Sequence, residues 1–209
     1  MNEKAVNEIR LNRLLKDGEL NLLKSQINPH FLFNSMNSVN SLIIKNPEQA
    51  QKMLVALSDY LRYAVLATNS QYSHIAGEME NIARYLSIEQ LRFGDKLHYE
   101  PDIDPSALSV EIPAMLLQPL FENAIKHGVY ESLDTVRIVT KITKDSQYLN
   151  IELSNDFDEE GVSQKKGSGT GLQNIRERLR LLYGTSAAMQ TKAEHGVFRV
   201  ILKIPAARQ

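Results

Sequence analysis

The first third of the chain spaces its apolar residues with the period of an amphipathic helix. Helix-forming residues run from about 3 to 45, and Asn46-Pro47 is a plausible stop. A second helix is expected from about Pro47 to Ala67. Its apolar side consists of Met53, Leu57, Leu61 and Ala64. Two long helices joined by a short turn indicate a helical hairpin. Because one hairpin buries little apolar surface, we expect two copies to pair into a four-helix bundle.

Beyond residues 68–74, which have the composition of a linker, the pattern changes to shorter helices and strands. The clearest hairpin is at 135–156, where β-branched residues alternate on both sides of Lys-Asp-Ser-Gln. We further expect helices at 77–93, 112–128 and about 172–183, and strands at 97–104, 187–193 and 196–204. The sequence therefore predicts an α+β protein, with a helical domain at 1–71 and a domain with a mixed, largely antiparallel sheet at 72–209. Gly128 suits the C-terminal cap of the helix at 112–128.

Composition excludes several classes of protein. Hydrophobic residues make up 43% of the 209 residues, which is typical of a folded chain. The formal net charge of -1 argues against a nucleic-acid-binding module, and the lack of cysteine excludes disulfides and thiolate metal sites. No apolar run approaches the ~20 residues that cross a bilayer, and the first ten residues are too polar for a secretory signal. We therefore expect a cytoplasmic chain.

The first helix presents one histidine beside a proline. On a helical wheel, His30 falls on a polar stripe with Asn34, opposite Met36 and Val39. Pro29 would cost roughly 3 kcal/mol inside a helix, so we expect a kink that opens the backbone beside His30. Two interpretations remain open: a surface histidine on a solvated face, or an imidazole presented as a nucleophile.

The stretch "FENAIKHG" at 121–128 also concentrates polar groups on one helix face. Asn123, Lys126 and His127 share that face, whereas Phe121 and Ile125 lie on the other. An amide oxygen can ligate Mg²⁺ and the two cationic side chains can meet phosphate oxygens, so this face suits a metal-bound polyphosphate. The alternative is an ordinary polar face.

The stretch "GSGTGL" at 167–172 precedes an amphipathic helix. Its glycines, Gly167, Gly169 and Gly171, would let the backbone approach an anion held by free N–H groups at the helix N-terminus. It is neither a P-loop, which needs Gly-Lys-Ser/Thr, nor a dinucleotide fingerprint, which needs glycine where Leu172 stands. The alternative is an ordinary surface loop.

Together, three stretches closely resemble the LytS-like sensor histidine kinases. They are "QINPHFLFNSMNSV", "LLQPLFENAIKHG" and "GSGTGLQNIRERLRLLYG", in this order, and the resemblance covers about residues 20 to 205. "YLSIEQLRFGDKL" is similar to a family segment between these motifs. The resemblance implies a dimerisation hairpin that carries the phosphorylated histidine, followed by a Bergerat-fold ATPase domain.

The resemblance also implies roles for individual residues. His30 would be the phospho-acceptor, and Asn34, one turn on, could orient its ring. Asn123 would hold Mg²⁺, with Lys126 and His127 near the phosphates of ATP. The three glycines would form a lid over the triphosphate.

One stretch departs from the family pattern. Related kinases have an acidic or amide residue followed closely by glycine where this chain has "IELSNDFDEEG". Asn155 aligns best as the residue that reads the adenine amino group, with Asp156 as the alternative. Phe157 stands where glycine is expected, which puts nucleotide affinity in doubt.

The function predicted from the resemblance is ATP-dependent autophosphorylation on His30 with Mg²⁺, followed by phosphoryl transfer to an aspartate of a response regulator. The implied partners are a second copy of the chain and a LytTR-type regulator, and a sensor region outside this chain would place the protein at the inner face of the cell membrane. A dimeric pseudokinase scaffold is the main rival, motivated by "SNDFDEEG". An anti-sigma-type serine kinase would leave His30 without purpose. A chaperone-type or gyrase-type ATPase needs a carboxylate where Pro119 stands.

Overall fold

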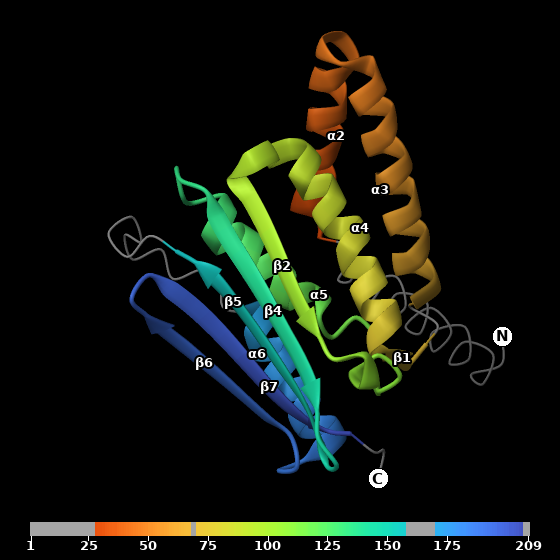
Figure 1. Ribbon diagram of the computed structural model, residues 1–209. Helices are drawn as coiled ribbons and strands as arrows, with labels where there is room; N and C mark the ends of the chain where they lie inside the picture. The colour runs from red at the N-terminus through yellow and green to blue at the C-terminus, as the bar shows by residue number, and fades with distance from the viewer. Residues whose placement is uncertain (1–27, 68–69, 158–169, 207–209) are drawn as a thin grey trace, which may run out of the picture. The chain divides into compact units, whose positions relative to one another are not determined.

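The computed structural model describes residues 28–67, 70–157 and 170–206. The chain forms two compact units, Met1–Gln71 and Tyr72–Gln209 (Figure 1). Within the described residues, no helix combines the length and the apolar character that a membrane span requires.

The first unit contains a hairpin of α2 (Pro29–Lys45) and α3 (Pro47–Ala67) (Figure 1). Phe31 and Tyr60 pack edge to face across the hairpin with their ring centroids 5.2 Å apart. The other buried residues repeat at helical spacing on the facing sides, namely Ser35 and Val39 of α2 and Ala50, Met53, Leu57 and Ala64 of α3. A pair of helices is therefore confirmed, with buried residues of each facing the other. The first helix was predicted from about residue 3, and the part before residue 28 lies outside the described residues.

The predicted kink at Pro29 is wrong. Asn28 has an extended backbone, and its side chain accepts hydrogen bonds from the backbone N–H groups of His30 and Phe31, so it caps a helix that begins at Pro29. The first helical hydrogen bond runs from Leu32 N to Asn28 O at 3.1 Å. Proline fits the first position of a helix because its missing N–H has no partner there.

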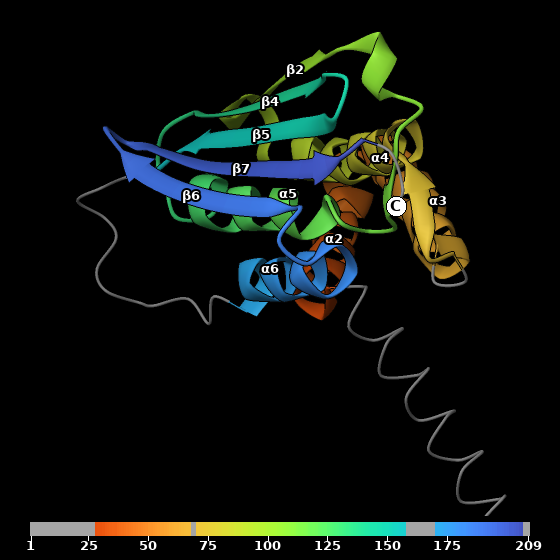
Figure 2. The same ribbon diagram turned by 90° about the horizontal axis from the view of Figure 1, so that it is seen from below.

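The second unit contains a five-stranded sheet in the order β2-β4-β5-β7-β6. β2 is parallel to β4 and the other neighbours are antiparallel, so the predicted mixed, largely antiparallel sheet is confirmed. The strands are β2 (Leu97–Ile103), β4 (Val136–Lys144), β5 (Tyr148–Asp156), β6 (Ala188–Glu194) and β7 (Val197–Pro205). The helices α4 (Ile75–Phe93), α5 (Gln118–Ala124) and α6 (Thr170–Tyr183) cover one face of the sheet (Figure 2). Short 3₁₀ turns at Gly94–Lys96 and Pro105–Ala107 flank β2.

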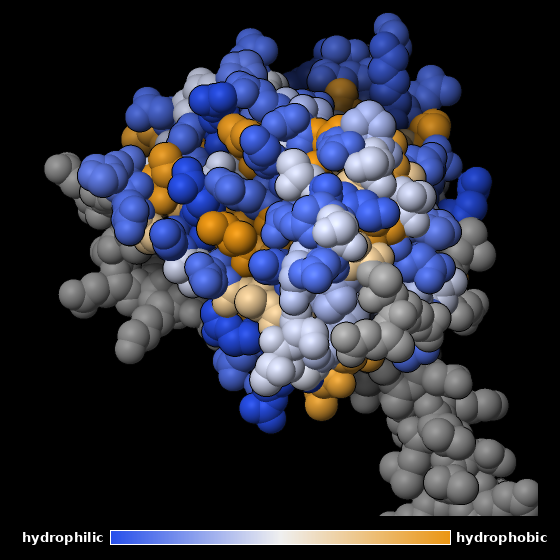
Figure 3. Space-filling model, turned by 60° about the horizontal axis from the view of Figure 1, so that its bottom comes forward, coloured by the Kyte–Doolittle hydropathy of each residue, from blue (hydrophilic) through white to orange (hydrophobic). Residues whose placement is uncertain are grey.

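The uncovered face of the sheet carries paired charges. Arg137 lies 2.6 Å from Glu100, and Arg199 lies 2.8 Å from Glu152, each pair crossing between strands. Such pairs are typical of a sheet face that remains in water. In the view of Figure 3, apolar side chains form small separate groups among polar ones.

The helix predicted at 112–128 begins later than expected, whereas its end agrees within one residue. Glu111–Pro113 is the strand β3, which pairs with β1 (Tyr72–His74) inside the segment expected to be a linker. Helix α5 begins only at Gln118 and passes into a π-helical turn at Ile125–Val129. Local sequence does not reveal a pairing between strands that are 37 or more residues apart, so a helical spacing in 112–117 was misleading.

Candidate functional site

The candidate phospho-acceptor lies in the first turn of α2. His30 is exposed, and the Nδ2 atom of Asn34 lies 3.3 Å from its Nδ1 and 3.1 Å from its Nε2. The amide nitrogen therefore lies at nearly equal distances from the two ring nitrogens. This contact follows from the four-residue spacing, which places the two side chains on neighbouring turns of one helix face.

A second group of predicted residues lies where α5 widens into the π-helical turn. Phe121 and Ile125 are 1% exposed and anchor this segment in the core. Asn123 is half-buried, and Lys126 is exposed. His127 is half-buried, with its Nδ1 atom 3.3 Å from the carboxylate of Glu131. An amide, an ammonium and an imidazole are thus presented from consecutive turns of one segment.

Gly128 brings the π-helical turn against the sheet. A Cβ atom at position 128 would lie 2.9 Å from Cγ1 of Val136, 3.1 Å from Nδ2 of Asn155 and 3.1 Å from the carbonyl oxygen of Asp156. The residue is therefore glycine because the backbone approaches β4 and β5 this closely, and the predicted C-terminal cap at Gly128 is wrong. The hydrogen bond from Tyr130 N to Ile125 O, 3.0 Å long, closes the wide turn around it.

Asn155 and Asp156, the two candidates for reading adenine, lie on opposite faces of the sheet. Asn155 continues the inward row of Leu149, Ile151 and Leu153 and is 3% exposed, and its Nδ2 donates to Asp156 O at 2.9 Å. Asp156 is half-buried, and its Oδ2 accepts from the backbone N–H of Arg137 on β4 at 2.9 Å. Because neighbouring strand residues alternate in direction, only Asn155 lies on the helix-covered face with the π-helical turn.

The glycine-rich stretch is only partly described. Gly167 and Gly169 lie outside the described residues. Gly171 is exposed in the first turn of α6, and among the described residues no atom beyond its chain neighbours and its own helix backbone lies within 4 Å of the position that its Cβ would take.

The buried carboxylate of Glu78 is a feature that sequence reasoning missed. It accepts hydrogen bonds from Met115 N at 2.8 Å and Leu117 N at 3.3 Å, and burial raises the pKa of Glu78. Met115 has a φ of 59°, so this carboxylate stabilises an otherwise unfavourable turn that sets the start of α5. The available signal was an acidic residue on the inward side of the helix predicted at 77–93.

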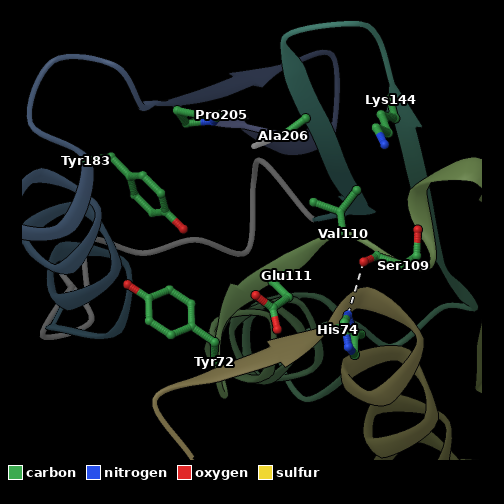
Figure 4. A pocket seen from close by; sticks show the side chains of 9 residues that line it. All are labelled: Tyr72, His74, Ser109, Val110, Glu111, Lys144, Tyr183, Pro205 and Ala206. Atoms are coloured by element: carbon green, nitrogen blue, oxygen red, sulfur yellow. Dashed lines mark hydrogen bonds between the residues drawn. The ribbon is translucent and has the colours of Figure 1, made fainter. Parts of the chain in front are cut away.

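A pocket of about 310 Å³ lies at the other end of the sheet. Figure 4 shows the hydroxyl ends of Tyr72 and Tyr183 on the same side of this pocket, and His74 Nδ1 donating to Ser109 O at 3.0 Å. Its lining comes from Tyr72, His74, Ser109, Val110, Glu111, Lys144, Tyr183, Pro205 and Ala206. Lys144 ends β4, whereas Gly128 meets Val136 at the start of that strand, so this pocket includes none of the predicted site residues.

Comparisons with known proteins agree with the motifs. A family profile described as "Histidine kinase" matches residues 18–97. The chain is 34% identical to the sensor histidine kinase BtsS of Escherichia coli over 199 residues, which are 94% of this chain and 35% of BtsS. It is 32% identical to the sensor protein LytS of Bacillus subtilis over 205 residues, which are 92% of this chain and 35% of LytS. The chain belongs to the LytS/BtsS/YpdA-type family of sensor histidine kinases.

The curated relatives are longer than this chain, and a solved structure shares its fold at low sequence identity. The chain spans 35% of the length of the BtsS and LytS relatives, so they describe longer proteins. Among solved structures, the histidine kinase domain of the blue-light activated histidine kinase EL346 from Erythrobacter litoralis has a TM-score of 0.51 at 14% identity, covering 92% of this chain and 96% of that one. At this identity the likeness concerns the fold, and it confirms a helix pair followed by a mixed-sheet domain of the histidine kinase type.

Proposed function

We propose that this chain is the cytoplasmic kinase region of a sensor histidine kinase, which phosphorylates itself on His30 with ATP. The observation that carries the proposal is the close approach of Gly128 to Asn155 at the end of β5. It joins that strand to the segment of α5 and the π-helical turn that bears Asn123, Lys126 and His127. Family membership supports ATP as the phosphoryl donor. In this assignment residues 1–71 form the dimerisation and phosphotransfer hairpin, and 72–209 form the ATP-binding domain.

The residues at this end of the sheet fit a nucleotide. Asn155 offers a buried amide at the end of an apolar row, which suits an adenine that is stacked in the core and read at its edge. Lys126 and His127 can meet phosphate oxygens, and the first turn of α6, with Gly171, offers backbone N–H groups. Asp156 lies on the opposite face of the sheet, so we do not propose it as the residue that recognises adenine.

Asn123 is the proposed Mg²⁺ ligand. A single amide oxygen is compatible with magnesium, which commonly takes only one or two protein ligands and otherwise binds substrate phosphates and water. When bound, Mg²⁺ neutralises charge that develops on the phosphates.

His30 would act as the nucleophile. A lone pair on one ring nitrogen attacks the γ-phosphorus, the bond from phosphorus to the β–γ bridging oxygen breaks, and ADP leaves. Asn34, whose amide nitrogen lies within 3.3 Å of both ring nitrogens, would orient the ring for this attack. The phosphoryl group would then pass to an aspartate of a response regulator of the LytTR type.

Labelling with radioactive ATP tests the proposal. The purified chain should gain acid-labile, base-stable phosphate, His30→Gln should abolish it, and Asn123→Ala should reduce it to background. His98→Gln, at an exposed histidine on β2, is the matched control and should label normally.

Two outcomes would contradict the proposal. Labelling that persists in His30→Gln would exclude His30 as the acceptor. A wild-type chain that forms its dimer but binds no ATP in a calorimetric titration would favour the pseudokinase scaffold, for which the lack of a glycine after Asn155 is the motive.

A further inference from the structure

A buried polar cluster joins the end of α4 to the exit of the π-helical turn. Glu89 of α4 is 0% exposed. Arg92 Nη1 donates to Glu89 Oε2 at 2.6 Å and to the hydroxyl oxygen of Tyr130 at 2.8 Å, and that hydroxyl donates to Glu89 Oε1 at 3.1 Å. The three groups therefore close a ring of hydrogen bonds. Two of these bonds are donated by the charged guanidinium of Arg92, and such bonds are stronger than those between neutral groups.

Aromatic and backbone contacts reinforce the cluster. The guanidinium of Arg92 lies 5.0 Å from the ring centroid of Phe93 and 5.3 Å from that of Tyr130, and the two rings are 5.2 Å apart. Just beyond α4, Lys96 Nζ donates to the carbonyl oxygen of Ser132. Four side chains from "EQLRFGDK" thus contact residues 130–132.

These contacts hold the residue at which the wide turn closes. Tyr130 donates its backbone N–H to Ile125 O and follows directly after Ile125–Val129. Inside that turn, Gly128 is fixed against Val136 and Asn155. The turn is therefore held at two places, on the sheet through Gly128 and on α4 through Tyr130.

We propose that Glu89, Arg92 and Tyr130 act as a positioning clamp for the π-helical turn and thereby set the affinity of the site for nucleotide. This inference rests on the proposed function, in which Lys126 and His127 of that turn meet the phosphates. None of the three clamp residues needs to touch the nucleotide. A π-helical turn has one more residue than the α-helix accommodates and tends to revert, so it persists where neighbouring contacts hold it.

The core of the experiment is Tyr130→Phe, which removes one hydroxyl and keeps the ring. Glu89→Gln, which removes the charge and keeps the shape, is the second variant. Glu80→Gln is the matched control, because Glu80 is an exposed residue of the same helix that pairs with Arg84 at 2.6 Å.

The first readout is amide hydrogen exchange of the full chain without nucleotide. Loss of a hydrogen bond to a charged group should speed exchange at residues 125–132 by about tenfold in both clamp variants. Exchange in α2 and α3 should stay at the wild-type rate, and Glu80→Gln should match wild type throughout.

The second readout is the dissociation constant for MgADP. We expect it to rise about five- to tenfold in Tyr130→Phe, while the labelling rate at saturating ATP stays within about twofold of wild type. A general loss of structure would raise the dissociation constant and also lower the labelling rate at saturating ATP. A change in the dissociation constant alone therefore identifies positioning.

If residues 125–132 exchange at the wild-type rate in both clamp variants, the clamp does not exist. If Glu89→Gln does not fold, the same result in Tyr130→Phe alone decides against it. If wild type binds MgADP and the clamp variants bind it with the same dissociation constant, the clamp has no role in nucleotide affinity. If wild type binds no MgADP, the proposed function fails, and the exchange readout still decides whether the clamp exists.

Discussion

At position 128 the absence of a side chain sets the distance between the wide turn and the sheet. A Cβ atom at this position would meet, among its nearest neighbours, the backbone oxygen of Asp156 at 3.1 Å, which cannot move away without disturbing β5. In the sequence, Gly128 stands near the end of a predicted helix, and this position predicts a C-terminal cap. Only the packing shows that the glycine serves a close approach instead.

Gly128→Ala should therefore destabilise the chain by about 1–3 kcal/mol, the usual range for overpacking. It should also weaken MgADP binding, because the turn must shift away from Asn155. Urea unfolding and a binding titration measure the two effects. Gly171→Ala is the control for stability: its Cβ meets no atom within 4 Å, so it should be neutral or stabilise α6 by up to about 1 kcal/mol. Equal stability of the two variants would contradict the packing argument.

Glu89 gives a pH dependence whose sign follows from its burial. Burial raises the pKa of Glu89 from 4.5 to about 7, although Arg92 and Tyr130 act in the opposite direction. The folded state thus holds the proton more tightly than the unfolded state. The stability that this provides is complete below pH 4.5 and is lost as the pH rises to about 7.

Wild type should therefore lose stability relative to Glu89→Gln between about pH 4.5 and 7, by on the order of 3 kcal/mol, with no further change above that. Urea unfolding of both proteins at pH 5, 6, 7 and 8 measures the difference, in which the contributions of other groups cancel. A difference that does not vary with pH would show that Glu89 titrates in the folded state as it does in the unfolded one.

At the scale of elements, the start of α2 decides how the phospho-acceptor candidate is presented. Asn28 caps the helix and Pro29 takes its first position, so His30 lies in the first turn, where backbone N–H groups still lack helical partners. The proline beside the histidine is thus part of a helix start. The same residues predicted a kink because a wheel cannot tell a helix interior from its beginning.

Pro29→Ala tests this reading. At the first helical position it should change the free energy of unfolding by only about 0.5 kcal/mol, whereas relief of an interior proline would stabilise the chain by roughly 3 kcal/mol. Asn28→Ala should cost about 1 kcal/mol and Asn28→Asp should retain the cap. Thermal or urea unfolding measures the stability of all three variants. A large gain in stability in Pro29→Ala would indicate that Pro29 is inside a helix and kinks it.

At the scale of the whole molecule, the described helices of the hairpin expose large apolar side chains. They include Phe33, Met36, Ile43 and Ile44 of α2 and Leu54 and Val55 of α3, with Phe33 71% and Ile44 88% exposed. Phe33 and Ile44 lie on the side of α2 opposite Phe31, Ser35 and Val39, which are buried. This arrangement supports the proposed homodimer, in which a second hairpin would cover these residues.

Ile44→Glu should therefore weaken the dimer by at least about 30-fold, as expected for a buried interface anchor. Sedimentation equilibrium of the purified chain measures the dissociation constant. Leu133→Glu is the matched control, because Leu133 is 99% exposed in the second unit. A dimer that tolerates Ile44→Glu as well as Leu133→Glu would place the interface elsewhere.

Elements that depend on neighbouring residues were predicted from the sequence, whereas contacts between distant segments were not. Pro47–Ala67 matches the expected helix because the apolar period and the proline start are both local signals. The hairpin at 135–156 matches because its strands are joined by a short turn. By contrast, β1 and β3 were missed, since Tyr72 pairs with Pro113 across a distance that no local pattern encodes. The clamp was missed for the same reason, since Glu89 and Tyr130 are 41 residues apart.

The sequence by itself determined the helix pair that meets at Asn46-Pro47, the alternating strands and the residue types of each motif, because helical and strand periods and short motifs are properties of neighbouring residues. Only the tertiary structure decided that Gly128 is a contact point, that Asn155 and Asp156 lie on opposite faces, and that Tyr130 is held from α4. Each of these depends on segments that meet only after folding, where burial and a few ångströms of separation determine what a side chain can do.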